Sequence, residues 1–209
     1  MKILSVSDKV IPFLYSPEIL EKIHDVDLVI ACGDLPYYYQ EYIIKKLRVP
    51  LFFVRGNHDP VVEYDANGER KAPRGGKDLH RRVVYQDELI LAGVEGCNRY
   101  NRQGNFQYTT AEMWMNVFRL VPELLINRLL YGRALDIFVT HAAPLGIHDK
   151  PDWTHRGIKA FNWLIRVFKP KYHFHGHNHV YKLDTITETQ VGETLVINTY
   201  GYKVKDLEL

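Results

Sequence analysis

Residues 51–59 read Leu-Phe-Phe-Val-Arg-Gly-Asn-His-Asp, an apolar run that ends in a compact group of polar side chains. The run has the character of a buried β-strand, and Gly56-Asn57-His58-Asp59 follow directly after it. The same order recurs at four other places: Asp8 follows Ile3–Val6, Gly33-Asp34 follow Leu28–Ala31, Thr140-His141 follow Ile137–Val139, and Gly176-His177-Asn178-His179 follow Tyr172–Phe174. In open α/β folds ligands gather at the carboxyl ends of strands, so these side chains are expected to meet in one crevice. Their oxygen and imidazole groups suit a divalent transition ion such as Mn, Fe or Zn.

The first half of the chain alternates between predicted strands and helices. A helix is predicted from Ser16 to about His24, because serine can cap free amides and Pro17 suits the first turn. Strands are predicted at 26–32 and 51–55, with a helix from about 40 to 48 between them. This alternation favours parallel strands joined by right-handed crossovers, and therefore an α/β fold.

The second half adds further strands and helices. Strands are predicted at 82–85, 88–93, 180–187 and 193–200, the last two as an antiparallel pair that closes a second sheet. The segment 109–130 is predicted to be helical but divided near Pro122, which lacks an amide donor, and 157–168 is predicted to be one helix. The polar segments 65–82 and 95–107 are predicted to be loops that flank the site.

The composition indicates a globular chain with a single domain over residues 1–209. Its apolar fraction of 46% is ordinary, and its net charge of +2 gives no strong nucleic-acid signal. Cys32 and Cys97 make no disulfide framework, which favours a reducing compartment, and the cytoplasm is the expected location. No apolar stretch resembles a signal peptide or approaches the roughly 20 residues of a membrane span, so we expect a soluble protein with no membrane partner.

The order of the motifs resembles that of the calcineurin-like metallophosphoesterases. The residues that carry the resemblance are Asp8, Gly33-Asp34, Gly56-Asn57-His58-Asp59, His141 and Gly176-His177-Asn178-His179, and they span essentially the whole chain. Within that superfamily, residues 140–146, 155–157 and 169–171 resemble the small MPPED-type phosphodiesterase subgroup. The resemblance implies an α+β fold of four layers, a two-sheet β-sandwich flanked by helices, with a dinuclear metal centre at the strand ends.

The resemblance also implies a role for each polar side chain. The implied metal ligands are Asp34 as a bridge, Asp8 and His179 at the first metal, and Asn57, His141 and His177 at the second. His58 corresponds to a histidine that is not a ligand and that stabilises the transition state or protonates the leaving oxygen. Asp59 is expected to orient the imidazole of His58.

Phosphate ester hydrolysis explains why two cations are wanted at one site. The ester oxygens are already negative, so a catalyst must generate hydroxide at neutral pH and neutralise charge at phosphorus. Two metal ions about 3.5 to 4 Å apart can hold a bridging hydroxide that attacks and can clamp both the entering and the leaving oxygens. We therefore expect two divalent ions, Mn²⁺ first and Fe or Zn as alternatives, and a small phosphate ester or nucleotide as substrate. The subgroup resemblance favours diesters over monoesters.

The chain departs from the family pattern at its first motif. The family reads Asp-x-His there, whereas this chain reads Asp8-Lys9-Val10. Valine cannot coordinate a metal, so the first site keeps only three protein ligands and is expected to bind its ion more weakly. An open three-ligand site can still support catalysis. Lys9 either places its ammonium group in the gap or remains in solvent.

Contacts to the substrate are less well indicated. Arg99 lies in a loop near the expected site and could hold phosphate oxygens through its guanidinium fork. The basic residues of segment 70–82 either attract phosphate or are merely solvated. Tyr37-Tyr38-Tyr39 either stack on a substrate base or serve in packing. His173 and His175 are interpreted as an exposed alternation beside the motif, and Trp153 and His155 as residues that could border the cleft.

A different class of function stays open. A degenerate relative could use the same sandwich as a binding scaffold without catalysis, and Val10 is the residue that favours this reading. The retained His58 favours the enzyme, because a scaffold has no need of an imidazole that is not a ligand. Nucleic-acid binding without catalysis is a more distant alternative because the net charge is small.

Overall fold

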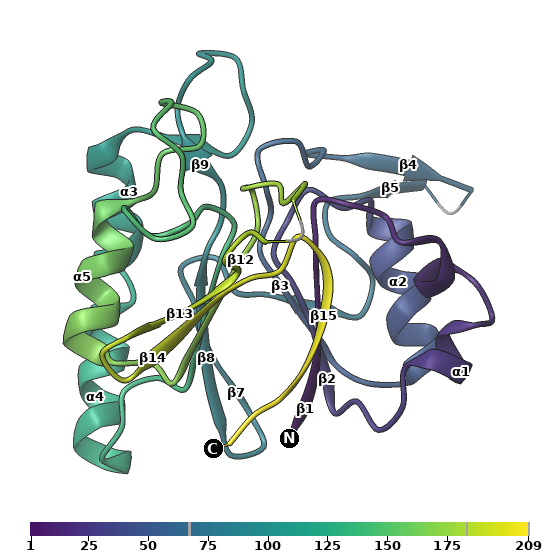
Figure 1. Cartoon of the computed structure of the whole chain (residues 1–209), viewed down its shortest axis with the longest axis horizontal. Coiled ribbons are helices and arrows are strands. Elements are labelled where there is room, and N and C mark those ends of the chain that lie inside the picture. Colours follow the sequence, from purple (N-terminus) through teal and green to yellow (C-terminus); the bar gives the residue numbers. More distant parts are fainter. Residues whose placement is uncertain (67, 183, 209) are drawn as a thin grey trace.

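The computed structural model describes residues 1–66, 68–182 and 184–208. Two β-sheets lie face to face at the centre of the molecule, with helices on both outer sides (Figure 1). None of the helices within the described ranges combines the length and the apolar character that a membrane crossing requires.

The first sheet has the strand order β15-β1-β2-β3-β6. Its strands are β1 (Lys2–Ser7), β2 (Leu28–Ala31), β3 (Leu51–Phe53), β6 (Gly76–Asp78) and β15 (Gly201–Asp206). The four strands from β1 to β6 are parallel, and β15 is antiparallel to β1 at the edge. The register aligns Val6 with Ala31 and Ala31 with Phe53, so β1, β2 and β3 end side by side.

The second sheet has the strand order β13-β14-β12-β11-β8-β7. Its strands are β7 (Val83–Gln86), β8 (Leu89–Val94), β11 (Ile137–Thr140), β12 (Tyr172–His175), β13 (Glu188–Val191) and β14 (Thr194–Asn198). The inner four strands are parallel, whereas β7 and β13 are antiparallel edges. The register aligns Val139 with Phe174, so the segments after β11 and β12 also leave the sheet side by side.

Helices and two short strand pairs complete the described chain. The helices are the 3-10 turn η1 (Pro12–Tyr15), α1 (Ile19–Lys22), α2 (Tyr37–Leu47), α3 (Thr110–Phe118), α4 (Val121–Tyr131) and α5 (Lys159–Phe168). The short pairs are β4 (Glu63–Asp65) with β5 (Gly68–Arg70), and β9 (Cys97–Asn98) with β10 (Gln107–Tyr108).

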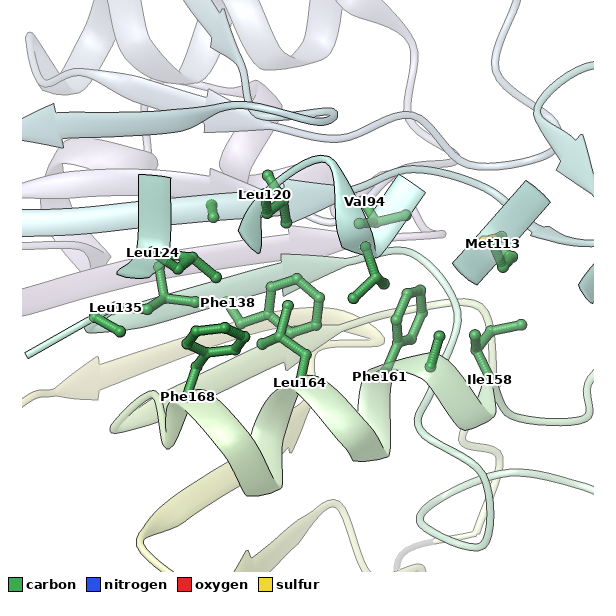
Figure 2. Packing of buried hydrophobic residues seen from close by; sticks show 14 of the residues in the cluster. Val94, Met113, Leu120, Leu124, Leu135, Phe138, Ile158, Phe161, Leu164 and Phe168 are labelled. Carbon is green, nitrogen blue, oxygen red and sulfur yellow. The ribbon is translucent and has the colours of Figure 1, made fainter. Parts of the chain in front are cut away.

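Three apolar interfaces hold four layers together. Along β1, Ile3 faces the second sheet while Leu4 faces α1 and α2, as the two-residue period of a strand requires. The third interface packs α3, α4 and α5 onto the second sheet. In Figure 2, Phe161, Leu164 and Phe168 project from one face of α5 into this cluster, and the rings of Phe161 and Phe138 meet edge to face at 5.6 Å. The predicted four-layer sandwich is therefore confirmed.

The two predicted helices around Pro122 are confirmed, and the structure explains the boundary. Thr109 caps α3 through a capping box with Glu112, and α3 ends at Phe118. Pro122 lies in the first turn of α4, where its missing amide has no helical partner to lose. Proline thus begins the second helix rather than kinking one long helix.

Several predicted boundaries are wrong. The helix predicted from Ser16 is only the four residues of α1, and α2 begins at Tyr37 rather than near residue 40. The strand predicted at 180–187, of which Leu183 lies outside the described residues, is found instead at Glu188–Val191. The turn at Gly192 sets this register, because β14 folds back onto the residues just before the turn, so that Val191 pairs with Thr194 and Glu188 with Ile197. The loop predicted at 65–82 contains β5 and β6, and β15 was not predicted.

Candidate metal centre

The strand ends bring six predicted metal ligands to the same end of the two sheets. Asp8 follows β1, Asp34 follows β2 and Asn57 follows β3 in the first sheet. Across the gap, His141 follows β11, and His177 and His179 follow β12. These connections lie at the end of the sandwich opposite the two chain termini (Figure 1).

The backbone at this end is bent in a way that L-residues seldom adopt. Asp8, Asp34 and His177 have φ values of 62°, 56° and 65°, in the left-handed region. Each therefore turns the chain sharply at the point where a polar side chain leaves its strand. Such strain is typical of functional sites, where the surrounding structure holds it in place.

Two glycines are required by close approach rather than by a turn. A Cβ atom on Gly56 would lie 2.0 Å from Oδ1 of Asp34 and 2.6 Å from Cε1 of His141. A Cβ atom on Gly176 would lie 1.8 Å from Oγ of Ser7. Any larger residue at either position would push apart the side chains that the strand ends bring together.

His141 lies at the centre of a tight group of polar atoms. Its Nε2 is 3.4 Å from Oδ2 of Asp34, 3.1 Å from Oδ1 of Asn57 and 3.1 Å from Nδ1 of His177. Two ligand atoms that each lie about 2.0 to 2.2 Å from one ion, at an angle between 90° and the tetrahedral value, are roughly 2.8 to 3.6 Å apart. The observed separations match this spacing.

Hydrogen bonds on the outer side decide which atoms face the centre of the group. His141 donates from Nδ1 to the Cys32 carbonyl at 2.7 Å, and His177 donates from Nε2 to the Thr154 carbonyl at 2.8 Å, because a carbonyl can only accept. Asn57 donates from its amide nitrogen to the Tyr100 hydroxyl at 3.0 Å. The inward atoms of all three side chains are therefore lone-pair acceptors, as is the carboxylate of Asp34. Four acceptors that face one point fit a cation, and bonds to the outer nitrogens are typical of histidines that bind metals.

The pKa values of His141, Asp34 and His177 also indicate that a positive charge is stabilised at the centre of this group. Burial alone would lower the pKa of His141, but the charge of Asp34 and the contact with it outweigh burial and raise that pKa to about 9. Burial opposes ionisation of Asp34, yet His141 and an amide of His58 hold its pKa well below the usual range. Burial and then the charge of His141 lower the pKa of His177 to about 4. In the protein without metal, one proton on His141 takes the place of a cation.

The surroundings of Asp8 are looser. Its carboxylate accepts the amide of His177 at 3.0 Å and the Ser7 hydroxyl, and it is 3.6 Å from Nε2 of His179. The side chain of His179 is 38% exposed and contacts the Tyr181 hydroxyl at 2.8 Å. Within the described ranges, the only group of three histidine or acidic side chains with ligand atoms within 4.8 Å of one another is Asp34, His141 and His177. Val10 packs against the apolar cluster between the first sheet and its helices.

The role predicted for Asp59 is wrong. Its carboxylate accepts backbone amides of Asp34, Leu35 and Gly56 at 3.0, 2.9 and 2.7 Å, and no hydrogen bond to the His58 ring is found among the described residues. Burial and the charge of Asp34 raise the pKa of Asp59 to about 7. Asp59 therefore fixes the two loops that carry Asp34 and Asn57 relative to each other. His58 is exposed, and its amide donates to Asp34 Oδ1 at 2.8 Å.

Arg99 has other partners in the structure. Its guanidinium contacts Glu112 at 2.9 Å and the Gln107 carbonyl at 3.2 Å, so the predicted phosphate contact would require these to break. Arg70, in the segment predicted to attract phosphate or to be solvated, is instead 9% exposed and forms ion pairs with Glu41 and Glu63.

The prediction that His173 and His175, beside the late motif, form an exposed alternation is wrong. His173 and His175 are fully buried. His173 contacts the Thr140 hydroxyl at 2.8 Å, and His175 contacts His148 at 3.0 Å. Their side chains are shielded from solvent because β12 is an inner strand of the second sheet, and the His173 ring packs against Phe138 and Phe161. Tyr37 and Tyr39 are also fully buried, which confirms the packing alternative, and Tyr38 is 44% exposed.

Three groups that shape the centre were not predicted. The carbonyls of Cys32 and Thr154 orient the two imidazoles, but a backbone oxygen leaves no mark in the sequence. The Tyr100 hydroxyl orients Asn57, and its only signal was its place in the polar segment 95–107, which was predicted to flank the site.

The profile of the calcineurin-like phosphoesterase family matches residues 1–181. One solved structure resembles the chain with a TM-score of 0.62 at 17% identity, covering 97% of this chain and 93% of its own. The protein TT1561 of Thermus thermophilus resembles it with a TM-score of 0.64 at 14% identity, covering 96% and 89%. GAP50, described as the anchor in the inner membrane complex of Plasmodium, has a TM-score of 0.52 at 12% identity, covering 95% and 70%. At these identities the structural likeness concerns the fold alone, and no curated protein sequence matches.

Proposed function

The chain belongs to the calcineurin-like phosphoesterase family, and from this membership we propose that it hydrolyses phosphate esters with divalent metal ions, phosphodiesters in preference to monoesters. The observation that carries the proposal is the convergence of four acceptor atoms, from Asp34, Asn57, His141 and His177, at the spacing of a coordination shell. Four lone pairs that face one another repel unless a metal ion, or a proton on His141, lies between them.

The residues divide into two metal positions. Asp34, Asn57, His141 and His177 would hold one ion, and Asp8 and His179 would hold a second together with Asp34. When bound, the ions activate a water molecule at neutral pH and neutralise charge on the phosphate. We propose Mn²⁺ as the ion, with Fe or Zn as alternatives, because the donor set mixes oxygen and imidazole nitrogen.

His58 is proposed to supply the proton for the leaving oxygen. Its amide is anchored on the carboxylate of Asp34, while its side chain is exposed at the rim of the centre. Exposure lets the ring exchange protons with solvent between turnovers, and an imidazole suits this task near neutral pH.

The position at Asp8 is proposed to be the weaker of the two. Val10 packs with apolar side chains, and His179 is partly exposed and 3.6 Å from Asp8. This weakness also supports the competing function, a binding scaffold that has lost catalysis. The acceptor cluster favours the enzyme, because protein binding does not require four buried acceptors to converge.

Buried thiols support a reducing compartment. Cys32 and Cys97 are both free and buried. We propose the cytoplasm as the location on this basis.

Metal content measured beside activity tests the proposed function. The purified protein is expected to bind Mn²⁺ and to hydrolyse bis(p-nitrophenyl) phosphate faster than p-nitrophenyl phosphate. Asn57→Leu is expected to lose both metal and activity, whereas Asn105→Leu, in an exposed part of the 95–107 segment, keeps both. Metal binding without hydrolysis of either ester would support the scaffold, and faster hydrolysis of the monoester would overturn the diester preference.

A further inference from the structure

A cavity of about 230 Å³ lies between the start of α3, the start of α5 and strand β9. Its lining includes Asn98, Met113, Trp114, Trp153, Arg156 and Lys159. Sites that enclose a whole drug-sized ligand have volumes of roughly 300 to 1,000 Å³. The cavity therefore fits one ring system of a larger molecule rather than a complete ligand.

Two chain segments that line the cavity continue into the metal centre, and we call these segments the shared walls. Trp153 lines the cavity, and the next residue, Thr154, accepts the hydrogen bond that orients His177. Asn98 lines the cavity, and Tyr100, two residues on, contacts Asn57 at 3.0 Å. Consecutive Cα atoms are only about 3.8 Å apart, so both walls reach from the cavity to a proposed metal ligand within two residues.

The shared walls are held firmly. The indole nitrogen of Trp153 donates to the Arg99 carbonyl at 2.9 Å, and the amide of Asn98 donates to the Arg156 carbonyl at 2.7 Å. The ring of His155 lies 5.2 Å from that of His177, which adds a contact between the same loop and the centre. The cavity is thus built by contacts and does not depend on a ligand to order its loop.

The lining offers three kinds of recognition. Trp153 is half-exposed and presents an aromatic surface, and Trp114 lines the cavity from α3. Asn98 is 5% exposed, and no donor to its amide oxygen is found among the described residues. Arg156 and Lys159 are exposed donors, and across residues 1–66, 68–182 and 184–208 no carboxylate forms an ion pair with either.

We propose that this cavity binds a planar heteroaromatic ring of the substrate, of the kind found in nucleobases. The inference rests on the proposed function for the placement of the phosphate, but the ring-binding property belongs to the cavity itself. Indole surfaces stack on flat rings, the Asn98 oxygen accepts from a ring N–H or amino group, and the cations donate to ring nitrogen or carbonyl acceptors. A purely hydrocarbon ring could pack on the indole surfaces but would offer no donor to the Asn98 oxygen and no acceptor to Arg156 or Lys159.

Binding to the metal-free protein tests this inference separately from catalysis. After removal of metal with a chelator, adenosine 5′-monophosphate and ribose 5-phosphate are titrated by calorimetry; the second probe carries a hydroxyl group at C1 in place of the base. Because one stacked base contributes about 1 to 3 kcal/mol, we expect the base-bearing probe to bind about tenfold more tightly. Trp153→Leu is expected to remove the difference, Trp153→Phe to retain most of it, and Tyr64→Leu, which changes an exposed aromatic on β4, to leave it intact.

An NMR measurement on the unaltered protein covers the case in which Trp153→Leu does not fold. The chain has three tryptophans, and their indole N–H signals can be followed together. Adenosine 5′-monophosphate is expected to shift the signals of Trp114 and Trp153 more than that of Trp163, and ribose 5-phosphate is expected to shift none of them. Equal affinity for the two probes, or a largest shift at Trp163, would overturn the inference. Failure of ester hydrolysis with the tenfold preference intact would refute the proposed function and leave the cavity's role standing.

Discussion

His141 has one ring nitrogen committed to the Cys32 carbonyl, and this hydrogen bond decides what the other nitrogen can do. With Nδ1 as donor, Nε2 either binds a cation or takes a proton. The charge of Asp34 makes the proton stable when no metal is bound, since it raises the pKa of His141 to about 9 despite burial. Metal and proton therefore compete for one atom.

This competition predicts proton release on metal binding. At pH 7 the metal-free protein carries a proton on His141, so uptake of one Mn²⁺ is expected to release about one proton, and the apparent affinity is expected to rise with pH up to about 9. Calorimetric titration in two buffers of different ionisation enthalpy measures the number released. A heat of binding that does not change between the buffers at pH 7 would contradict the assignment of Nε2 as a ligand.

Val10 stands where the resemblance to the family implies a histidine. Val10→His is expected to tighten the metal position proposed to be the weaker, because it supplies an imidazole two residues after Asp8. The measurement is bound metal per protein after dialysis against graded chelator, with Val10→Ala as the control for lost packing against the apolar cluster. If Val10→His and Val10→Ala retain equal amounts of metal, the ligand-depleted position has been wrongly identified.

The start of α3 shows how one element is fixed at its end. The Thr109 side chain accepts the amide of Glu112 at 3.3 Å, and the Glu112 carboxylate accepts the amide of Thr109 at 2.7 Å and also holds Arg99. This capping box places the helix start directly after β10 and beside the cavity. The cap thus serves both local helix stability and the position of a wall.

Removal of this cap predicts a measurable loss of stability. Thr109→Ala is expected to lower the free energy of unfolding by about 1 kcal/mol, a typical cost for an N-cap threonine. Urea denaturation measures it, and Thr110→Ala, the same change one residue into the helix, is expected to have almost no effect. Equal effects of the two substitutions would show that the cap contributes nothing specific.

Two neutral histidines in contact, His175 on β12 and the partly buried His148 in the loop after β11, affect the stability of the whole molecule. His175 donates to the Gly176 carbonyl at 3.0 Å and faces His148 at 3.0 Å, and His148 faces the Thr189 hydroxyl at 2.9 Å. Burial, and then repulsion from Lys203, lower the pKa of His148 to about 4. Burial, and then repulsion from His148, lower that of His175 to about 3.

These shifts predict acid lability. Below the ordinary histidine pKa of about 6.5 the unfolded chain takes up protons that the folded chain refuses, so stability present above pH 6.5 is lost as pH falls toward 4. Each such histidine contributes a slope of up to about 1.4 kcal/mol per pH unit. Urea denaturation between pH 7 and 4.5 is expected to show a shallower loss for His148→Gln than for the parent, with the exposed His24→Gln as control. An unchanged slope in His148→Gln would remove this histidine from the explanation.

The elements of the fold that could be predicted are those whose burial produces a recognisable apolar run in the sequence. The inner strands β1, β2, β8 and β11 are fully or almost fully buried, and buried parallel strands appear as continuous apolar runs. The edge strand β15 is short, with partly buried lysines alternating with the exposed side chains of Tyr202 and Val204, and its partner is β1, far away along the chain. Its pairing depends on the closure of the whole sandwich, which no local pattern records.

The metal ligands of the candidate site could be predicted because their position after apolar runs is visible in the sequence. The prediction failed for features that depend on contacts between distant loops. Asp34, Asn57, His141 and His177 carry their chemistry in their side chains, and each follows an apolar run. The role of Asp59 depends on two loops that meet in space, where its carboxylate receives amides from both. The cavity beside Trp153 likewise forms only when the segments around β9 and α5 pack together.

Anomalous diffraction from a crystal grown with Mn²⁺ would locate the proposed metal ions. We expect a manganese peak bonded to Asp34, Asn57, His141 and His177, with Nε2 of His141 and Nδ1 of His177 as the ligating ring atoms, and a weaker second peak between Asp34, Asp8 and His179. The absence of a peak within that group of four side chains, at a manganese concentration that occupies other sites in the crystal, would contradict the proposal.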